Sequence, residues 1–104
     1  MISSRGLAQP TELNERLKDL MPFLPGVVRL RCTFDDDWSG DPAIFFWITL
    51  SDDAARKEVL SRTGRRVMDF ITQRLDPMAQ WGLIPYFNFR SQSEQAKLRE
   101  EVFD

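Results

Sequence analysis

Three segments of the chain have residue patterns that are typical of β-strands. They cover residues 27–34, 43–50 and 83–90. In the first segment the apolar residues share one parity: Val28, Leu30, Cys32 and Phe34. Residues 43–50 are apolar on both parities, which is typical of a strand covered on both faces. The pattern predicts a three-stranded sheet with this segment in the centre and helices packed on the face that carries Val28 and Leu30.

Two longer segments repeat apolar residues at helical spacing. The first begins at Pro10 and ends before the Pro25–Gly26 pair. The second is expected to run from a helix cap at Ser51 to about Leu75. Gly64 lies inside it, where a kink or a break into two helices is possible.

The last predicted helix covers residues 91–103. Ser91 and Glu94 have the spacing of a capping box, in which each side chain accepts the other residue's backbone N–H. The element order is therefore α-β-β-α-β-α, and the fold class is α+β, with a small mixed three-stranded sheet and helices packed on one face. A single domain is expected over residues 1–104, with residues 1–9 as a loose leader.

The shared parity of the first two strands limits how they pair. In one register Phe34 lies opposite Ile44 and Arg31 faces Trp47. In the other register Arg31 faces Phe45. Both registers place an arginine across from an aromatic ring, which permits a cation–π contact.

Composition excludes classes of function more than it identifies one. The chain has 104 residues, 42% of them hydrophobic and 29% charged, and a net charge of −2. These values are ordinary for a globular protein and argue against a dedicated nucleic-acid binder. The absence of histidine removes Ser–His and Cys–His mechanisms and nearly all zinc or iron sites. No catalytic residue and no cofactor is assigned.

Cys32 is the only cysteine, so no intramolecular disulfide can form. It alternates with core positions and is interpreted as a small buried hydrophobe, because a nucleophilic thiol needs an activating base or an electropositive setting. The sequence contains no apolar run long enough for a signal peptide or a membrane span. A cytoplasmic location without membrane contact is therefore expected.

The loop from Asp35 to Asp41 begins like a calcium-binding loop, with oxygen ligands at alternate positions before Gly40. The position that needs a bidentate glutamate is Phe46, and the flanking segments are strands instead of helices. The loop is interpreted as a solvated hairpin turn, and no metal ligand is assigned. A weak metal-dependent activity at this loop is one alternative hypothesis.

The sheet face opposite the core carries an uncommon mixture of aromatic and basic residues. They are Arg29, Arg31, Phe45, Trp47, Tyr86 and Arg90. A terminal segment could cover this face, another protein could bind it, or it could stack nucleic-acid bases. The favoured interpretation is a non-catalytic protein–protein interaction or accessory module that self-associates through this face, or binds a small protein partner.

Basic residues also gather in the second helical segment, where four are candidates for contacting nucleic acid: Arg56, Arg62, Arg65 and Arg66. Such a charge run is usually a solvated helix face. The α-β-β-α-β order resembles KH-type RNA-binding domains and ribosome-binding factor A, which implies an RNA-binding accessory protein as a further alternative. A KH loop needs Gly-x-x-Gly. None of the five glycines has that spacing, so no functional residue is carried over.

Overall fold

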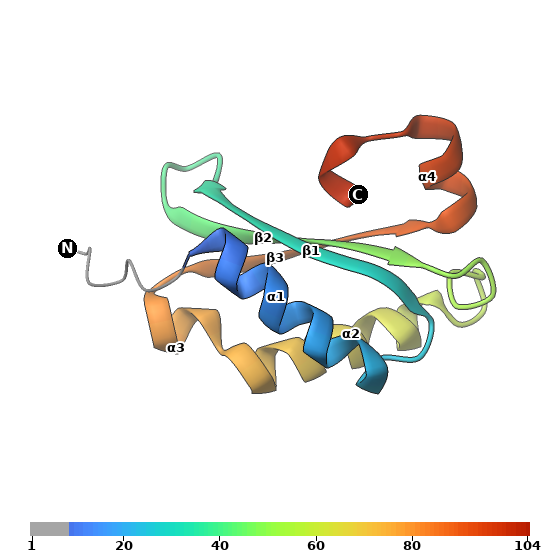
Figure 1. The fold of residues 1–104 in the computed structure, drawn as a ribbon, viewed down its shortest axis with the longest axis horizontal. Helices are drawn as coiled ribbons and strands as arrows, with labels where there is room; N and C mark the ends of the chain where they lie inside the picture. The colour runs from blue at the N-terminus through green and yellow to red at the C-terminus, as the bar shows by residue number, and fades with distance from the viewer. Residues whose placement is uncertain (1–8) are drawn as a thin grey trace.

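The computed structural model describes residues 9–104. The predicted leader lies outside the described residues except for Gln9, whose carbonyl accepts the N–H of Leu13 at the start of the first helix. Three strands form one sheet: β1 (Val27–Asp36), β2 (Pro42–Leu50) and β3 (Ile84–Ser91). β2 lies in the centre, antiparallel to β1 and parallel to β3 (Figure 1). The mixed sheet and the central place of the second strand are confirmed.

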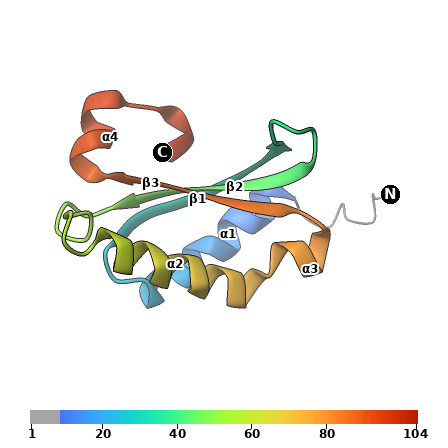
Figure 2. The same ribbon diagram turned by 180° about the vertical axis from the view of Figure 1, so that it is seen from behind.

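Helices connect and cover the strands. They are α1 (Pro10–Leu20), the short helix η2 (Met21–Phe23), α2 (Leu60–Leu75), α3 (Pro77–Trp81), α4 (Gln92–Leu98) and the short helix η3 (Glu101–Phe103). The α+β fold and the predicted element order are confirmed. Figures 1 and 2 show α1, α2 and α3 on one face of the sheet, here called the inner face, and α4 with η3 on the other, the outer face. No helix in residues 9–104 is long and apolar enough to cross a bilayer.

The core lies between the inner face and the helices α1 and α2. Every second residue of β2 contributes to it, and four of these are 0% exposed: Ile44, Phe46, Ile48 and Leu50. They belong to one cluster with Leu13 and Leu17 of α1 and with Val67 and Ile71 of α2. The ring of Phe46 also stacks on that of Phe87 from β3, with centroids 5.0 Å apart. The alternation in the sequence therefore identified the buried side of β2.

The prediction that Val28 faces the core is wrong. The register between β1 and β2 shifts between Val27 and Arg29. Val27 is 8% exposed and Val28 is 39% exposed. A bulge adds one residue to a strand, so residues before it point to the opposite face from the one that alternation predicts.

Residues 51–59 depart from the predicted long helix, because they form turns and α2 begins only after them. The predicted cap does form, since Ser51 Oγ accepts the N–H of Ala54 at 3.2 Å. The turn does not propagate, and tertiary bonds hold its first residues instead. The Asp52 carboxylate accepts the backbone N–H of Ser93 at 3.0 Å and its hydroxyl at 2.5 Å, at the beginning of α4.

α2 continues through Gly64 without a break. Gly64 is buried, and a methyl group in its place would lie 3.7 Å from the ring of Phe89. The helix backbone therefore lies over β3 at this point, at a distance that would leave a methyl group in ordinary van der Waals contact with the ring.

The C-terminal segment also differs from the predicted single helix. The capping box forms as expected, with Ser91 and Glu94 bonded to each other's backbone. The helix ends at Leu98, because Arg99 adopts a left-handed conformation with φ of 53°. This residue reverses the chain and brings Phe103 back over the outer face, where it is buried.

Gly26 connects η2 to β1 with a φ of +93°. Gly26→Ala is expected to lower the free energy of unfolding by about 2–4 kcal/mol, because a side chain is strained at positive φ and the new methyl would lie 2.7 Å from the Cβ of Ala54. Gly40→Ala is the matched control. Its φ is +87° with nothing within 4 Å, so only the strain of about 1–2 kcal/mol remains. Urea unfolding measures both, and equal losses would contradict the predicted clash.

Candidate functional site: the outer face of the sheet

Five aromatic rings lie in contact across the outer face. Between ring centroids, Trp38 is 5.3 Å from Tyr86, Tyr86 is 5.2 Å from Phe45, Phe45 is 6.0 Å from Trp47, and Trp47 is 5.3 Å from Phe103. Aromatic pairs at such separations contact favourably. We call these five residues the ring series. The three residues in the middle of the series, Tyr86, Phe45 and Trp47, are those predicted from the sequence to lie on this face.

The C-terminal segment covers one end of the ring series. Phe103 is 4% exposed and sets its ring at 74° to that of Trp47. The Arg90 guanidinium lies 4.3 Å from the centroid of the Phe103 ring and forms an ion pair with Glu100. Two of the predicted interface residues, Trp47 and Arg90, are therefore engaged by the chain itself.

The two arginines of β1 hold the same segment. Arg31 lies opposite Trp47, in the first of the two predicted registers. Its Nη1 donates to the carbonyl of Glu101 at 3.0 Å, and Arg29 Nη1 donates to the carbonyl of Asp104 at 3.4 Å. Each guanidinium thus donates to a backbone carbonyl of the C-terminal segment. The ring that contacts Trp47 is that of Phe103, where the sequence had suggested an arginine. At this end, a terminal segment of the chain covers the outer face, which is one of the three possibilities raised from the sequence.

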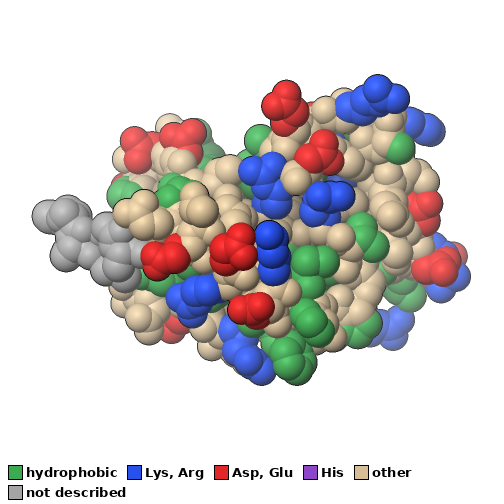
Figure 3. Space-filling view, viewed as in Figure 1, with side chains coloured by type: hydrophobic (Ala, Val, Ile, Leu, Met, Phe, Trp, Pro, Cys, Tyr) green, Lys and Arg blue, Asp and Glu red, His purple; other side chains and the backbone are tan. Residues whose placement is uncertain are grey.

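The opposite end of the ring series is open. Trp38 is 83% exposed at the tip of the β1–β2 hairpin, while Phe45 and Tyr86 are half-buried. Figure 3 shows acidic side chains at the hairpin end and, across a hollow in the outline, a mixture of basic and acidic side chains over the C-terminal segment. No role was predicted for Trp38 from the sequence. A tryptophan inside the polar turn of residues 35–41 is the signal that could have identified it.

The hairpin turn that presents Trp38 is organised by Asp37. Its Oδ1 accepts the N–H of Ser39 at 2.9 Å, the hydroxyl of Ser39 at 3.0 Å and the N–H of Asp41 at 3.0 Å. Its Oδ2 accepts the hydroxyl of Tyr86 at 2.8 Å. The bond from Tyr86 is the main reason that the pKa of Asp37 lies below its usual value and that the pKa of Tyr86 lies above its own. The turn is therefore tied to β3, and Trp38 is held over Tyr86.

These bonds also bear on the metal hypothesis for the loop. Both carboxylate oxygens of Asp37 already accept hydrogen bonds within the chain. Across residues 9–104, no three His, Cys, Asp or Glu side chains converge as metal ligands would. The loop has the chemistry of a hydrogen-bonded turn, with Gly40 at a positive φ.

Cys32 lies on the inner face and is 1% exposed, so the prediction that it is buried is confirmed. Burial raises the pKa of its thiol to about 12. A thiol in this state is protonated at neutral pH and is a poor nucleophile.

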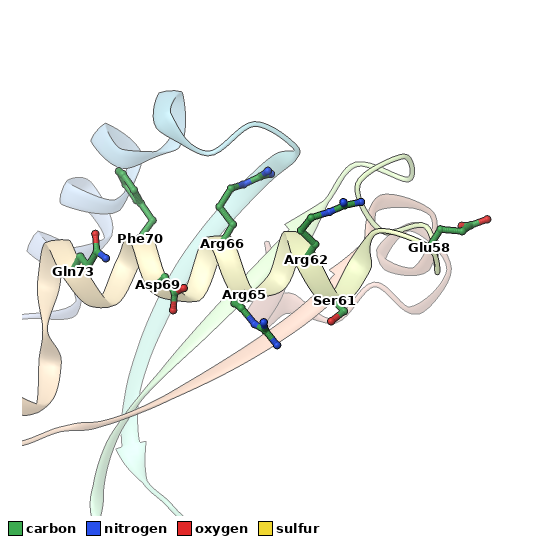
Figure 4. A pocket seen from close by; sticks show the side chains of 8 residues that line it. All are labelled: Glu58, Ser61, Arg62, Arg65, Arg66, Asp69, Phe70 and Gln73. Carbon is green, nitrogen blue, oxygen red and sulfur yellow. The ribbon is translucent and has the colours of Figure 1, made fainter.

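Three of the four candidate nucleic-acid residues, Arg62, Arg65 and Arg66, lie along one hollow on α2. Figure 4 shows Arg62, Arg66 and Phe70 on one side of α2, and Arg65 with Asp69 on the other. These residues line a shallow hollow of about 760 Å³ together with Glu58, Ser61 and Gln73. Arg56 lies before α2, in the turns of residues 51–59. The hollow therefore combines charges of both signs.

No protein-family model matches this chain, and neither the curated proteins nor the solved structures contain a match. Functional assignment depends on the chemistry of the surfaces described above.

Proposed function

We propose that this chain is a non-catalytic protein–protein interaction module that self-associates through the aromatic and arginine face of its sheet. The observation that carries the proposal is Trp38, which is 83% exposed and yet held against the ring of Tyr86. Aromatic residues and arginine are enriched at the centres of protein interfaces. Contiguous exposed apolar patches on soluble proteins usually mark binding sites. A single buried cysteine fits action in the reducing cytoplasm.

A second copy of the chain is the proposed partner because symmetric dimers are the commonest soluble assemblies. The two ends of the outer face also differ in charge. Asp35 and Asp41 are exposed beside Trp38, whereas the end covered by the C-terminal segment mixes basic and acidic side chains (Figure 3). A two-fold axis brings the acidic end of one copy toward the mixed end of the other, where basic side chains can pair with it.

Trp38→Glu is expected to weaken the dimer by about 2 kcal/mol or more, which is roughly a thirty-fold rise in Kd. The reason is that the variant removes a large exposed ring and adds a charge within the proposed contact. Sedimentation across low to high micromolar concentrations measures the effect. Met78→Glu is the matched control, because Met78 is 51% exposed on α3, outside the ring series. A wild-type chain that stays monomeric, or equal effects of both variants, would overturn the proposal.

RNA binding through α2 is the alternative function. Arg62 and Arg66 point to the same side of the helix (Figure 4), as contact with consecutive phosphates requires. Phosphate binding weakens steeply as salt rises. Titration of single-stranded and hairpin RNA against wild type and an Arg62→Glu, Arg66→Glu double variant separates the two functions. Salt-sensitive binding that the double variant loses would favour this alternative.

A further inference from the structure

Strand β3 lies at the edge of the sheet, and one of its two sides is unpaired. It pairs with β2 on one side, and within residues 9–104 the sheet has no strand beyond it. Figure 2 shows this edge facing the viewer, between α4 above and the helices α2 and α3 below. Open edges are sites where a strand of another chain can add to a sheet, and proteins commonly protect them.

The other edge of the sheet, along β1, is protected at Cys32 and at Asp36. The side-chain amide of Asn14 in α1 accepts the N–H of Cys32 at 2.8 Å and donates to its carbonyl at 3.1 Å. The carboxylate of Asp35 accepts the N–H of Asp36 at 2.8 Å. Side chains thus occupy backbone groups that another strand would need. The contrast between the two edges indicates that β3 is the one left available for pairing.

The same bonds identify the backbone groups that β3 presents. Because Cys32 directs its N–H and C=O toward Asn14, its antiparallel partner Phe46 directs its own groups toward β3. Phe46 lies opposite Phe87 in the parallel register. In a parallel pair, a residue bonds to the two neighbours of the residue opposite it, so the backbone N–H and C=O of Phe87 point away from β2, to the open side. Phe89 is two residues further along the strand and directs its own N–H and C=O to the same side.

The remaining outward positions of β3 carry no free donor. Pro85 has no N–H. The N–H of Ser91 donates to the Glu94 carboxylate at 2.9 Å. The open edge therefore offers two N–H groups, those of Phe87 and Phe89, and the carbonyls of the same residues.

We propose that β3 pairs antiparallel with β3 of a second copy, about a two-fold axis at Asn88, to form one continuous six-stranded sheet. Phe87 of each copy then lies opposite Phe89 of the other, and each of the four N–H groups meets a carbonyl. On the outer face, Tyr86 lies across from Arg90 of the second copy. The inference rests on the proposed self-association and specifies its geometry.

Two charged residues of α2 are also placed so that they can pair across the proposed two-fold axis. α2 lies over β3 where Gly64 approaches Phe89. Arg65 and Asp69 are one turn apart and project together from one side of this helix (Figure 4). Reversal by the two-fold axis sets Arg65 of one copy against Asp69 of the other, in two equivalent pairs. On the outer face, Trp38 rests on Tyr86 and so lies beside the seam.

Cysteine cross-linking tests the register directly. Asn88→Cys is expected to form a disulfide-linked dimer under mild oxidation, because the two residues become a closely spaced antiparallel pair whose Cα atoms are about 4.5 Å apart. The native Cys32 provides a silent background, since it is buried. Val28→Cys is the matched control on the protected edge, at a residue that is 39% exposed. Efficient cross-linking of Asn88→Cys alone supports the pairing, whereas equal cross-linking of both variants, or of neither, overturns it.

Charge variants then separate this inference from the proposed function. Asn88→Lys places like charges together on the axis and should weaken the dimer about tenfold or more. Arg65→Glu should also weaken it, and adding Asp69→Arg should restore it. A monomeric wild type would overturn both proposals. A dimer that responds to Trp38→Glu but not to Asn88→Lys or to the charge exchange would overturn the β3 pairing alone.

Discussion

Replacing Phe46 by alanine is expected to lower the free energy of unfolding by about 3–5 kcal/mol. Phe46 is 0% exposed at the middle of the central strand, and its ring stacks on that of Phe87. Substitution removes the burial of a whole ring and leaves a cavity between two strands and two helices. Since domains of this size are stable by only about 5–15 kcal/mol, the variant should be close to unfolding at body temperature.

Urea unfolding followed by circular dichroism measures the loss for Phe46→Ala. Phe45→Ala is the matched control, because it removes the same ring from the next residue of the same strand, on the half-exposed outer face. A smaller loss is expected there, since part of that ring already contacts water. Equal losses for the two variants would show that the inner face is not the principal core.

Phe103→Ala is expected to release the C-terminal segment from the outer face and to cost about 2–4 kcal/mol. Phe103 is buried against Trp47 and lies under the Arg90 guanidinium. Without the ring, the chain after α4 keeps only exposed or partly exposed polar contacts, which contribute little in water. They come from Gln95 and from the arginines Arg29, Arg31 and Arg90. Local release limits the loss, because the segment can detach while the sheet and the inner helices stay folded.

Fluorescence reports this release at Trp47. In a Trp38→Phe, Trp81→Phe background, Trp47 is the remaining tryptophan of the three, and its emission should shift to the red when Phe103 is removed. Leu98→Ala is the control, because Leu98 is 58% exposed at the end of α4. An unchanged emission in Phe103→Ala, or an equal shift in Leu98→Ala, would contradict the covering role of Phe103.

Several features of the candidate site could be predicted from sequence because they depend on strand parity. Side chains alternate between the two faces, so Phe45, Trp47 and Tyr86 had to share one face once the core residues shared the other. The exposed position of Trp38 could not be predicted in the same way. It depends on the turn built by Asp37 and on the hydroxyl of Tyr86, which lies far away in the sequence.

The sequence alone determined the α+β class, the element order, the buried parity of β2 and the capping box at Ser91. These properties depend on side-chain periodicity and on hydrogen bonds between residues close in the chain, which act in any tertiary context. Helix formation over residues 51–59 was predicted from similar local signals and did not occur. There Asp52 bonds to Ser93, and a tertiary bond outweighed a weak local preference.

Only the tertiary structure decided the register of β1 and β2, the bulge that exposes Val28, and the return of Phe103 across the outer face. Alternation allowed two registers with equal parity, so packing between distant segments had to choose one. The same holds for the edges of the sheet. Asn14 covers the edge of β1 from a helix remote in sequence, while β3 stays open, and no local pattern carries that difference.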